Sequence, residues 1–172
     1  MLAIKRLGPA EAADARLPNE PFRLWGRFIL ALEDGRWSYR VEPLAREETD
    51  CFPEEDYDVK EEGAIFLGAY LDGRCVGLAV LRRDLFRWLN LDDLKVSSAC
   101  RGRGIGGRLL EACMEEARAQ GLVGVRVVAQ DNNASACLFY LAHGFSIGGF
   151  DNRSYAGTKQ AGKADIFFYR AL

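Results

Sequence analysis

Glycine and arginine alternate in one short stretch of the chain, in a pattern suited to binding an anion. The stretch reads RGRGIGG and comprises Arg101, Gly102, Arg103, Gly104, Ile105, Gly106 and Gly107. Glycine has no Cβ atom, so the backbone can approach a ligand closely with several N–H groups directed at it. Arginine guanidinium groups are good partners for phosphate oxygens. The sequence therefore predicts a phosphate-binding turn at residues 101 to 107.

An amphipathic helix is expected directly after this turn, ending at Gly121. Ile105, Leu109, Cys113 and Ala117 recur every four residues, which predicts one face packed into a core. The first turn of a helix carries the positive end of its dipole, and this end also favours an anion. The turn and the helix thus point to the same ligand chemistry.

Two well-known phosphate-binding motifs can be compared with this stretch. A Walker loop ends in Gly-Lys-Ser/Thr, whereas here Arg108 follows Gly107. Gly102, Gly104 and Gly107 match the GxGxxG spacing of a dinucleotide fold, but residues 121 to 129 read GLVGVRVVA and supply no acid at the end of the next strand. An ordinary tight turn is the remaining alternative to a cofactor site.

A second motif follows the helix and the strand after it. It consists of Asn133, Ala136 and Tyr140, followed by Gly144 and Phe145. Together with Arg101, Gly104 and Gly106, this pair of motifs resembles the GNAT superfamily of N-acetyltransferases, which transfer an acetyl group from acetyl-CoA to an amine. The resemblance implies one α/β domain over residues 1 to 172, with a mixed central β-sheet flanked by helices. Its two central strands would splay apart to form the acetyl-CoA cleft.

The hydrophobic pattern predicts the elements that such a fold needs. Asp72-Gly73 marks a hairpin turn between two apolar strands, and a third strand leads into the glycine turn. Residues 22 to 32 could form either a helix or a strand. The other expected elements are a helix ending near Leu141 and strands at residues 2–7, 37–44, 64–71, 75–81, 86–96, 122–130, 145–150 and 164–170.

The resemblance also implies which residues hold acetyl-CoA. Residues 101 to 107 would hold its pyrophosphate through backbone amides, and the backbone of Lys95, Val96 and Ser97 would pair with the pantetheine amides. The side chain of Asn133 would take another polar group of the pantetheine arm. Tyr140 would donate a proton to the departing thiolate, since a phenol with a reference pKa of about 10 is a competent donor at neutral pH. A core aromatic beside Phe139 is the alternative reading of Tyr140.

Aminolysis of a thioester also needs a base, because a protonated amine must lose its proton before it attacks. Asp92 and Asp93 lie on the strand that leads into the cofactor turn. Side chains alternate along a strand, so the two carboxylates are expected on opposite faces, with only one in the cleft. Position does not choose between them, and a structural role for either stays open. An acid of the segment 47 to 62 is a further alternative.

The segment 47 to 62 is dense in acidic residues and is expected to be a loop, with at most a short helix. Its nine acids are Glu47, Glu48, Asp50, Glu54, Glu55, Asp56, Asp58, Glu61 and Glu62. They form either a solvated surface or a negative region that attracts a cationic substrate.

This segment, Glu20-Pro21-Phe22, Gln130 to Asn133 and Tyr155-Ala156 resemble the streptothricin N-acetyltransferases, a GNAT branch that confers antibiotic resistance. The resemblance implies a primary amine of streptothricin, a cationic small molecule, as the acceptor. A peptide, protein or polyamine amine is the alternative acceptor, and a non-catalytic acyl-CoA binding module is the alternative function.

Composition sets the remaining expectations. A chain of 172 residues that is 49% hydrophobic can bury a core, and a net charge of -2 argues against a nucleic-acid partner. The start MLAIKRLG is too short and charged for a signal peptide, and no apolar run is long enough to span a membrane, so a cytoplasmic enzyme is expected. Five scattered cysteines and the single His143 predict no metal site. The oligomeric state is left open, with a homodimer among the alternatives.

Overall fold

The protein is a mixed α/β structure, as predicted. The computed structural model describes residues 1–83 and 86–172. Its larger sheet has seven strands in the order β1-β4-β5-β6-β7-β9-β8, and β2 and β3 form a separate two-stranded sheet. The chain divides into two compact units that alternate along the sequence. The first comprises Met1–Glu20, Phe52–Arg126 and Ala171–Leu172, and the second comprises Pro21–Cys51 and Val127–Arg170. The expectation of a single domain stays a prediction.

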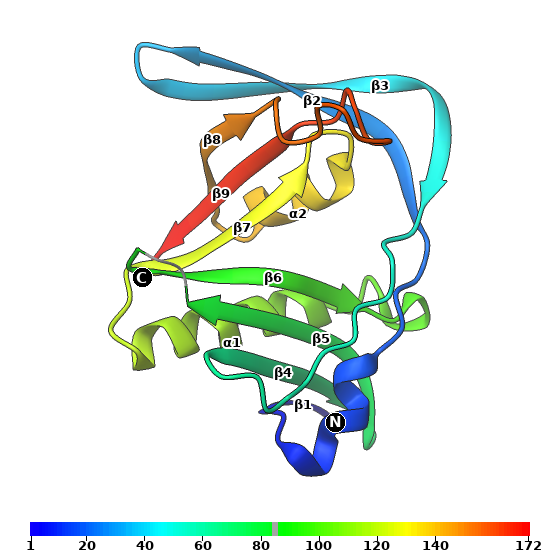
Figure 1. Cartoon of the computed structure of the whole chain (residues 1–172), viewed down its shortest axis with the longest axis vertical. Helices are drawn as coiled ribbons and strands as arrows, with labels where there is room; N and C mark the ends of the chain where they lie inside the picture. Colours follow the sequence, from blue (N-terminus) through cyan, green and yellow to red (C-terminus); the bar gives the residue numbers. More distant parts are fainter. Residues whose placement is uncertain (84–85) are drawn as a thin grey trace. The chain divides into compact units, whose positions relative to one another are not determined.

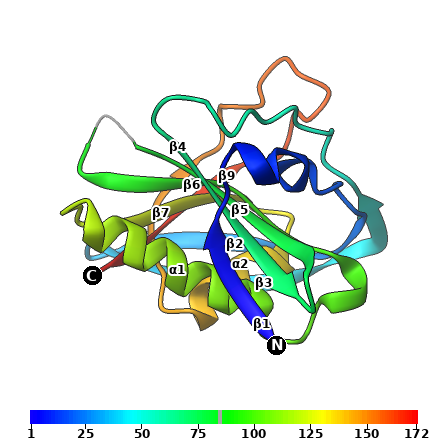
Figure 2. The ribbon, with the colours of Figure 1, turned by 90° about the horizontal axis from the view of Figure 1, so that it is seen from below.

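The first unit is built on four antiparallel strands with helices on both faces. The strands are β1 (Leu2–Arg6), β4 (Ala64–Leu71), β5 (Arg74–Arg83) and β6 (Trp88–Val96). Helix α1 (Ile105–Ala119) covers one face, and the short 3-10 helix η1 (Pro9–Arg16) lies on the other (Figures 1 and 2). The buried face of α1 is the predicted apolar one, formed by Ile105, Leu109, Leu110, Cys113, Met114 and Ala117.

The predicted turn between β4 and β5 is confirmed. Asp72 and Gly73 have φ angles of 50° and 83°, the left-handed pair that a two-residue hairpin turn requires. Strand β1 lies at the edge of the sheet and pairs with β4, also as expected.

Strand β6 contains an irregularity that the sequence pattern did not predict. Val80 of β5 pairs with Asp93, but the next residue, Leu81, pairs with Leu91. Asp92 is therefore an extra residue on β6, which defines a β-bulge. Beyond a bulge, the alternation of side chains between the two faces shifts by one residue, so the bulge decides where the following side chains point.

The second unit contains a long hairpin and the C-terminal part of the fold. The hairpin consists of β2 (Phe22–Glu33) and β3 (Arg36–Asp50), so residues 22 to 32 form a strand rather than a helix. Strand β7 (Gly124–Gln130) leads to helix α2 (Ala134–Ala142), and β8 (Ser146–Asp151) pairs antiparallel with β9 (Asp165–Ala171) (Figure 1). These last elements match the predicted helix and closing hairpin.

Strand β2 packs closely on the start of α2. A Cβ atom on Gly26 would lie 3.0 Å from Val41 and 3.4 Å from Ala134, so a larger residue here would require its neighbours to shift by a few tenths of an ångström. The indole N–H of Trp25 donates to Ser135 Oγ at 2.8 Å. Together these contacts fix the start of α2 against the hairpin.

Candidate active site

The predicted phosphate-binding turn follows β6 and runs into α1. Gly102 and Gly104 both have φ angles of 74°, and Gly104 is the left-handed N-cap of α1. No atom of the described chain lies within 4 Å of a Cβ placed on either glycine, so the space beside both is open. Gly106 and Gly107 lie within the first turn of α1 rather than in the preceding turn. The backbone N–H groups of a first helical turn have no partner within the helix and are available to an anion.

Short hydrogen bonds brace the segment between β6 and this turn. The Glu20 carboxylate accepts from the Ser98 N–H at 2.7 Å, and hydrogen bonding from the side chain and then the backbone of Ser98 lowers the pKa of Glu20. Arg101 Nε donates to the Val96 carbonyl at 3.0 Å. One nitrogen of Arg101 therefore supports the backbone of the turn, and the Val96 carbonyl, predicted to pair with pantetheine, already accepts a hydrogen bond. Arg103 is exposed on the turn itself.

The two candidate bases do not lie on opposite faces of β6. Arg82 donates to Oδ2 of Asp92, and Asn90 donates to its Oδ1. The Arg82 guanidinium also lies 5.8 Å from the centroid of the Tyr57 ring, and Tyr57 contacts Asp93. Both carboxylates are therefore on the side of Arg82 and Tyr57, so the expected alternation is wrong. The bulge at Asp92 is the reason, because consecutive side chains do not alternate between the two faces of the strand where an extra residue is inserted.

Asp93 is bound through one of its two oxygens. Its Oδ2 accepts from the Tyr57 hydroxyl at 3.2 Å and lies 3.2 Å from Lys95 Nζ. Among the residues that the structure describes, no donor contacts its Oδ1. Burial, together with the neighbouring Asp93 carboxylate, raises the pKa of Tyr57. Sequence reasoning missed Tyr57, since nothing in a loop sequence links it to a strand residue 36 positions away.

In the second unit, Asn133 and Tyr140 lie on α2. Asn133 is the N-cap of this helix, and its Oδ1 accepts from the Ala136 N–H at 3.1 Å. Capping uses the amide oxygen and leaves the amide NH2 group as a donor. Tyr140 is 8% exposed, and its ring packs against Phe145 and Phe168 at centroid distances of 5.6 and 5.8 Å. The ring of Tyr140 is therefore part of the core, whatever its hydroxyl does.

Two sequence pieces singled out above are joined by hydrogen bonds in this unit. Gln130 Nε2 donates to the Tyr155 hydroxyl at 3.0 Å, and that hydroxyl donates to Asp165 Oδ1 at 2.8 Å. Lys163 Nζ lies 3.3 Å from both Gln130 Oε1 and Asp50 Oδ2. Burial is the largest cause that raises the pKa of Asp165 and of Tyr155. Lys163 and Asp165 were not predicted as site residues, because only the folded structure brings them into contact with Gln130 and Tyr155.

The acidic segment is part strand and part loop. Glu47 to Asp50 complete β3, so for these residues the predicted loop is wrong, while most of the remainder has no regular structure. Several of its acids form ion pairs, namely Glu47 with Arg23, Asp50 with Lys163, Asp56 with Arg16, and Glu61 with Arg82. These pairs partly neutralise the segment and reduce its attraction for a cationic substrate.

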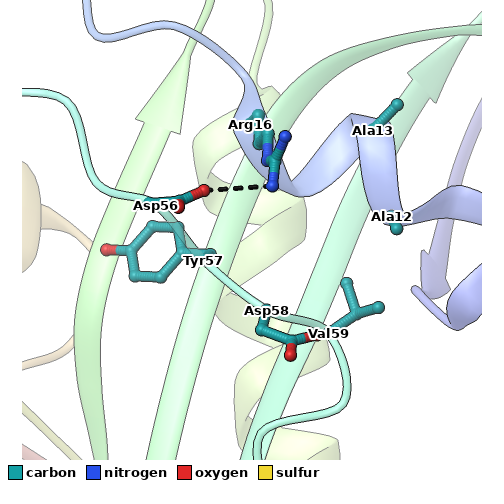
Figure 3. A pocket seen from close by; sticks show the side chains of 7 residues that line it. All are labelled: Ala12, Ala13, Arg16, Asp56, Tyr57, Asp58 and Val59. Carbon is teal, nitrogen blue, oxygen red and sulfur yellow. Dashed lines mark ion pairs between the residues drawn. The ribbon is translucent and has the colours of Figure 1, made fainter.

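The first unit also has an open pocket of about 450 Å³ beside this loop (Figure 3). It is lined by Ala12, Ala13, Arg16, Asp56, Tyr57, Asp58 and Val59. Asp92, Asp93, Tyr140 and the predicted cofactor-binding residues do not line it, whereas Asp56 and Asp58 belong to the acidic segment that was the alternative source of a base. Tyr57 is its link to the candidate site, because the Tyr57 hydroxyl points away from the other lining side chains and bonds to Asp93 (Figure 3).

Residues 28–145 match the model of the acetyltransferase (GNAT) family. The chain belongs to this family. A Bacillus subtilis (strain 168) protein named streptothricin acetyltransferase A is 34% identical to this GNAT chain over 91% of the chain and 92% of that protein. A streptothricin acetyltransferase of Escherichia coli is 26% identical over 94% of the chain and 91% of that protein.

Solved structures agree with this membership. A Bacillus anthracis str. Ames protein named as a streptothricin acetyltransferase, crystallised with acetyl coenzyme A, has a TM-score of 0.92 with 26% identity, and the match covers 100% of both chains. A nourseothricin acetyltransferase is similar in fold, with a TM-score of 0.82 at 23% identity over 99% of this chain and 98% of that one.

The GNAT chain is thus an N-acetyltransferase with acetyl-CoA as its co-substrate. Its glycine turn fits a pyrophosphate, because Gly102 and Gly104 leave open space at the N-terminus of α1 and Arg103 adds an exposed cation. Within residues 1–83 and 86–172, His, Cys, Asp and Glu side chains form no group of three or more that could hold a metal ion. No helix in the same part of the chain is both long and apolar enough to cross a bilayer.

Proposed function

We propose that this GNAT enzyme acetylates a primary amine of a cationic small molecule, with streptothricin as the favoured acceptor. The observation that carries the proposal is the 34% identity to a streptothricin acetyltransferase, which extends over 91% of the chain. This alignment extends beyond the family match at residues 28–145, so it also covers sequence outside the part that GNAT proteins share.

The co-substrate supplies an activated acetyl group, and we assign its binding to the residues predicted from the sequence. The backbone of the turn from Arg101 to Gly107 would hold the pyrophosphate, supported by the open glycines and the start of α1. The backbone of Lys95, Val96 and Ser97 would pair with the pantetheine arm. The Asn133 NH2 group, which capping does not use, would donate to the same arm.

Asp93 is our choice of base over Asp92. Asp92 has a donor on each oxygen, whereas Asp93 Oδ1 has none among the described residues. In the proposed reaction Asp93 Oδ1 takes a proton from the acceptor ammonium, and the freed nitrogen forms a bond to the thioester carbon. The bond from that carbon to sulfur breaks, and the Tyr140 hydroxyl gives a proton to the thiolate. The second proton that the nitrogen loses as the amide forms then replaces the one that Tyr140 gave. A backbone N–H near Val96 would polarise the acetyl carbonyl.

The acceptor's positive charge agrees with the carboxylates that the chain exposes in residues 47 to 62. Glu48, Glu55 and Glu62 are exposed, and none of the ion pairs described above includes them. Exposed carboxylates raise the local concentration of a cation and speed its association. This argument supports a cationic acceptor as a class and does not depend on which antibiotic carries it.

The test is a steady-state assay of coenzyme A thiol release with streptothricin, polyamines, aminoglycosides and peptides with free N-termini. We expect kcat/KM for streptothricin to exceed that for the other amines by at least about 100-fold, the discrimination that about 3 kcal/mol supplies. Turnover of another amine without turnover of streptothricin would remove the acceptor and keep the reaction class. Binding of acetyl-CoA with no turnover of any amine would favour the non-catalytic module.

A further inference from the structure

Tyr57 is held in place on several sides. Its ring packs edge-to-face on Phe66 at 5.6 Å and contacts the buried cluster of Leu7, Ala15, Phe66, Leu78 and Val80. The cations of Arg82 and Lys95 lie 5.8 and 5.7 Å from the ring centroid, within the range of cation–π attraction. The ring therefore has little freedom, and its hydroxyl is presented to Asp93.

The loop that carries Tyr57 is fastened to β6 through Asn19. The Asn19 backbone N–H donates to both oxygens of Glu54 at 3.0 and 3.2 Å, and its Nδ2 donates to the Pro53 carbonyl at 2.7 Å. Asn19 Oδ1 in turn accepts from Lys95 Nζ at 3.1 Å. Lys95, with only 10% of its side chain exposed, thus connects the loop, through Asn19, to the Asp93 carboxylate.

The bulge at Asp92 places Asp93 on the face of β6 that Tyr57 covers. Beyond the bulge, Asp93 pairs with Val80 and Lys95 pairs with Leu78. Paired residues of neighbouring strands share a face, and Val80 and Leu78 both belong to the cluster under Tyr57. Without the extra residue, β6 would present the other set of side chains to this cluster.

We propose that Tyr57 is a positioning residue for Asp93: its hydroxyl and the Lys95 ammonium hold Oδ2, which directs Oδ1 to the acceptor amine. This inference rests on the proposed function, in which Asp93 is the base. An ionised Asp93 is the form that can accept the proton of the acceptor ammonium.

The other charged groups near Tyr57 and Asp93 also belong to the first unit. Lys95 contacts Asp93 directly, and Arg82, on the neighbouring strand, divides its guanidinium between Glu61 and Asp92. Glu55 is the other carboxylate whose charge acts on Tyr57. Because burial and these carboxylates raise the pKa of Tyr57, its hydroxyl keeps its proton and stays a donor throughout the pH range of an enzyme assay.

The experiment is the kinetic profile of Tyr57→Phe, with kcat and KM measured separately, against the unmodified enzyme and with whichever amine the assay above turns over. Phenylalanine keeps the ring packing and removes the donor. We expect kcat to fall by about tenfold with KM changed by less than about twofold, since Asp93 loses one of the two groups that orient it while binding of the acceptor is unaffected. The matched control is Tyr70→Phe, which removes a hydroxyl that donates to Asp14 elsewhere in the first unit. It should leave the profile unchanged.

A Tyr57→Phe profile that superimposes on that of the unmodified enzyme overturns the inference, and so does a rise in KM with kcat unchanged. If Tyr57→Phe does not fold, judged by its thermal melt, Lys95→Gln tests the same point and should likewise lower kcat more than it changes KM. An unmodified enzyme that acetylates no amine contradicts the proposed function instead, because it leaves no profile to compare.

Discussion

Asp92 and Asp93 are consecutive residues of β6, yet among the described residues Asp92 receives a donor on each carboxylate oxygen and Asp93 receives donors on Oδ2 alone. An acid whose oxygens are both occupied is a structural anchor, whereas an acid held by one oxygen is positioned and still able to take a proton. The distinction depends on the bulge, which gives the two neighbours different partners on the same side of the strand.

Asp93→Asn should lower kcat by about 100- to 10,000-fold, because the amide cannot accept the amine proton and general base catalysis is worth that much. Asp92→Asn should keep kcat within about fivefold of the unmodified enzyme and lower stability by about 1 kcal/mol through the weakened contact with Arg82. Steady-state kinetics and urea unfolding measure the two effects. The reverse pattern would make Asp92 the base.

Gly104→Ala should weaken acetyl-CoA binding as well as stability. The residue has a φ of 74°, so an alanine there is strained by about 1 to 2 kcal/mol even though its Cβ would meet no atom of the described chain. Gly73→Ala is the matched control, with a φ of 83° and equally open space in the hairpin turn. Calorimetry should give a roughly tenfold higher Kd for acetyl-CoA with Gly104→Ala, because about 1.4 kcal/mol of backbone strain in the cofactor-bound turn corresponds to that factor. Gly73→Ala should leave the Kd unchanged.

Tyr140→Phe should reduce kcat by about 100-fold with the Kd for acetyl-CoA nearly unchanged, because only the proton donor is removed. The packing of the ring against Phe145 and Phe168 is retained, so the thermal melt should change little. Tyr39→Phe, on the exposed side of the hairpin and stacked on Phe28, is the control and should be fully active. A fully active Tyr140→Phe enzyme would leave this tyrosine with its core role alone.

Thiol reactivity should divide the cysteines by burial. Burial raises the pKa of Cys113 and of Cys137 to about 12, so at pH 8 both remain protonated and lack the reactive thiolate. Cys51 is exposed and should react with Ellman's reagent first, while Cys113 and Cys137 should react only after unfolding. Rapid labelling of all five thiols in the native protein would contradict the burial.

Asp131→Ala should destabilise the protein by about 2 kcal/mol, because the change leaves two partners of a buried carboxylate unmatched. Asp131 is 5% exposed, accepts from the Ala164 N–H at 3.0 Å and lies 3.4 Å from Arg27 Nε. Urea unfolding followed by tryptophan fluorescence measures the loss. Asp34→Ala, in the turn of the β2–β3 hairpin, also replaces an aspartate, but an exposed one, and should cost about 1 kcal/mol or less.

The glycine turn, the amphipathic helix after it and the Asp72-Gly73 hairpin could all be predicted from the sequence, because each depends on residues close together in the chain. The bulge at Asp92 could not, since it depends on how β5 pairs with β6. Tyr57 was missed for a similar reason, because its hydroxyl reaches Asp93 across 36 residues of chain. Residues 22 to 32 stayed ambiguous as a sequence because their apolar run suits a helix as well as a strand, and pairing with β3 is what makes them β2.

The extra residue in β6 also affects how related enzymes should be aligned. The alternation of side chains between the two faces of β6 shifts by one residue at Asp92. A gap-free alignment to a relative with a regular strand would therefore match side chains that lie on opposite faces. An enzyme engineered by transplanting this strand would need a residue at the position of Asp92 to keep the bulge, whatever the side chain of that residue. Shortening the strand by that one residue would invert the remainder of β6 up to the cofactor loop.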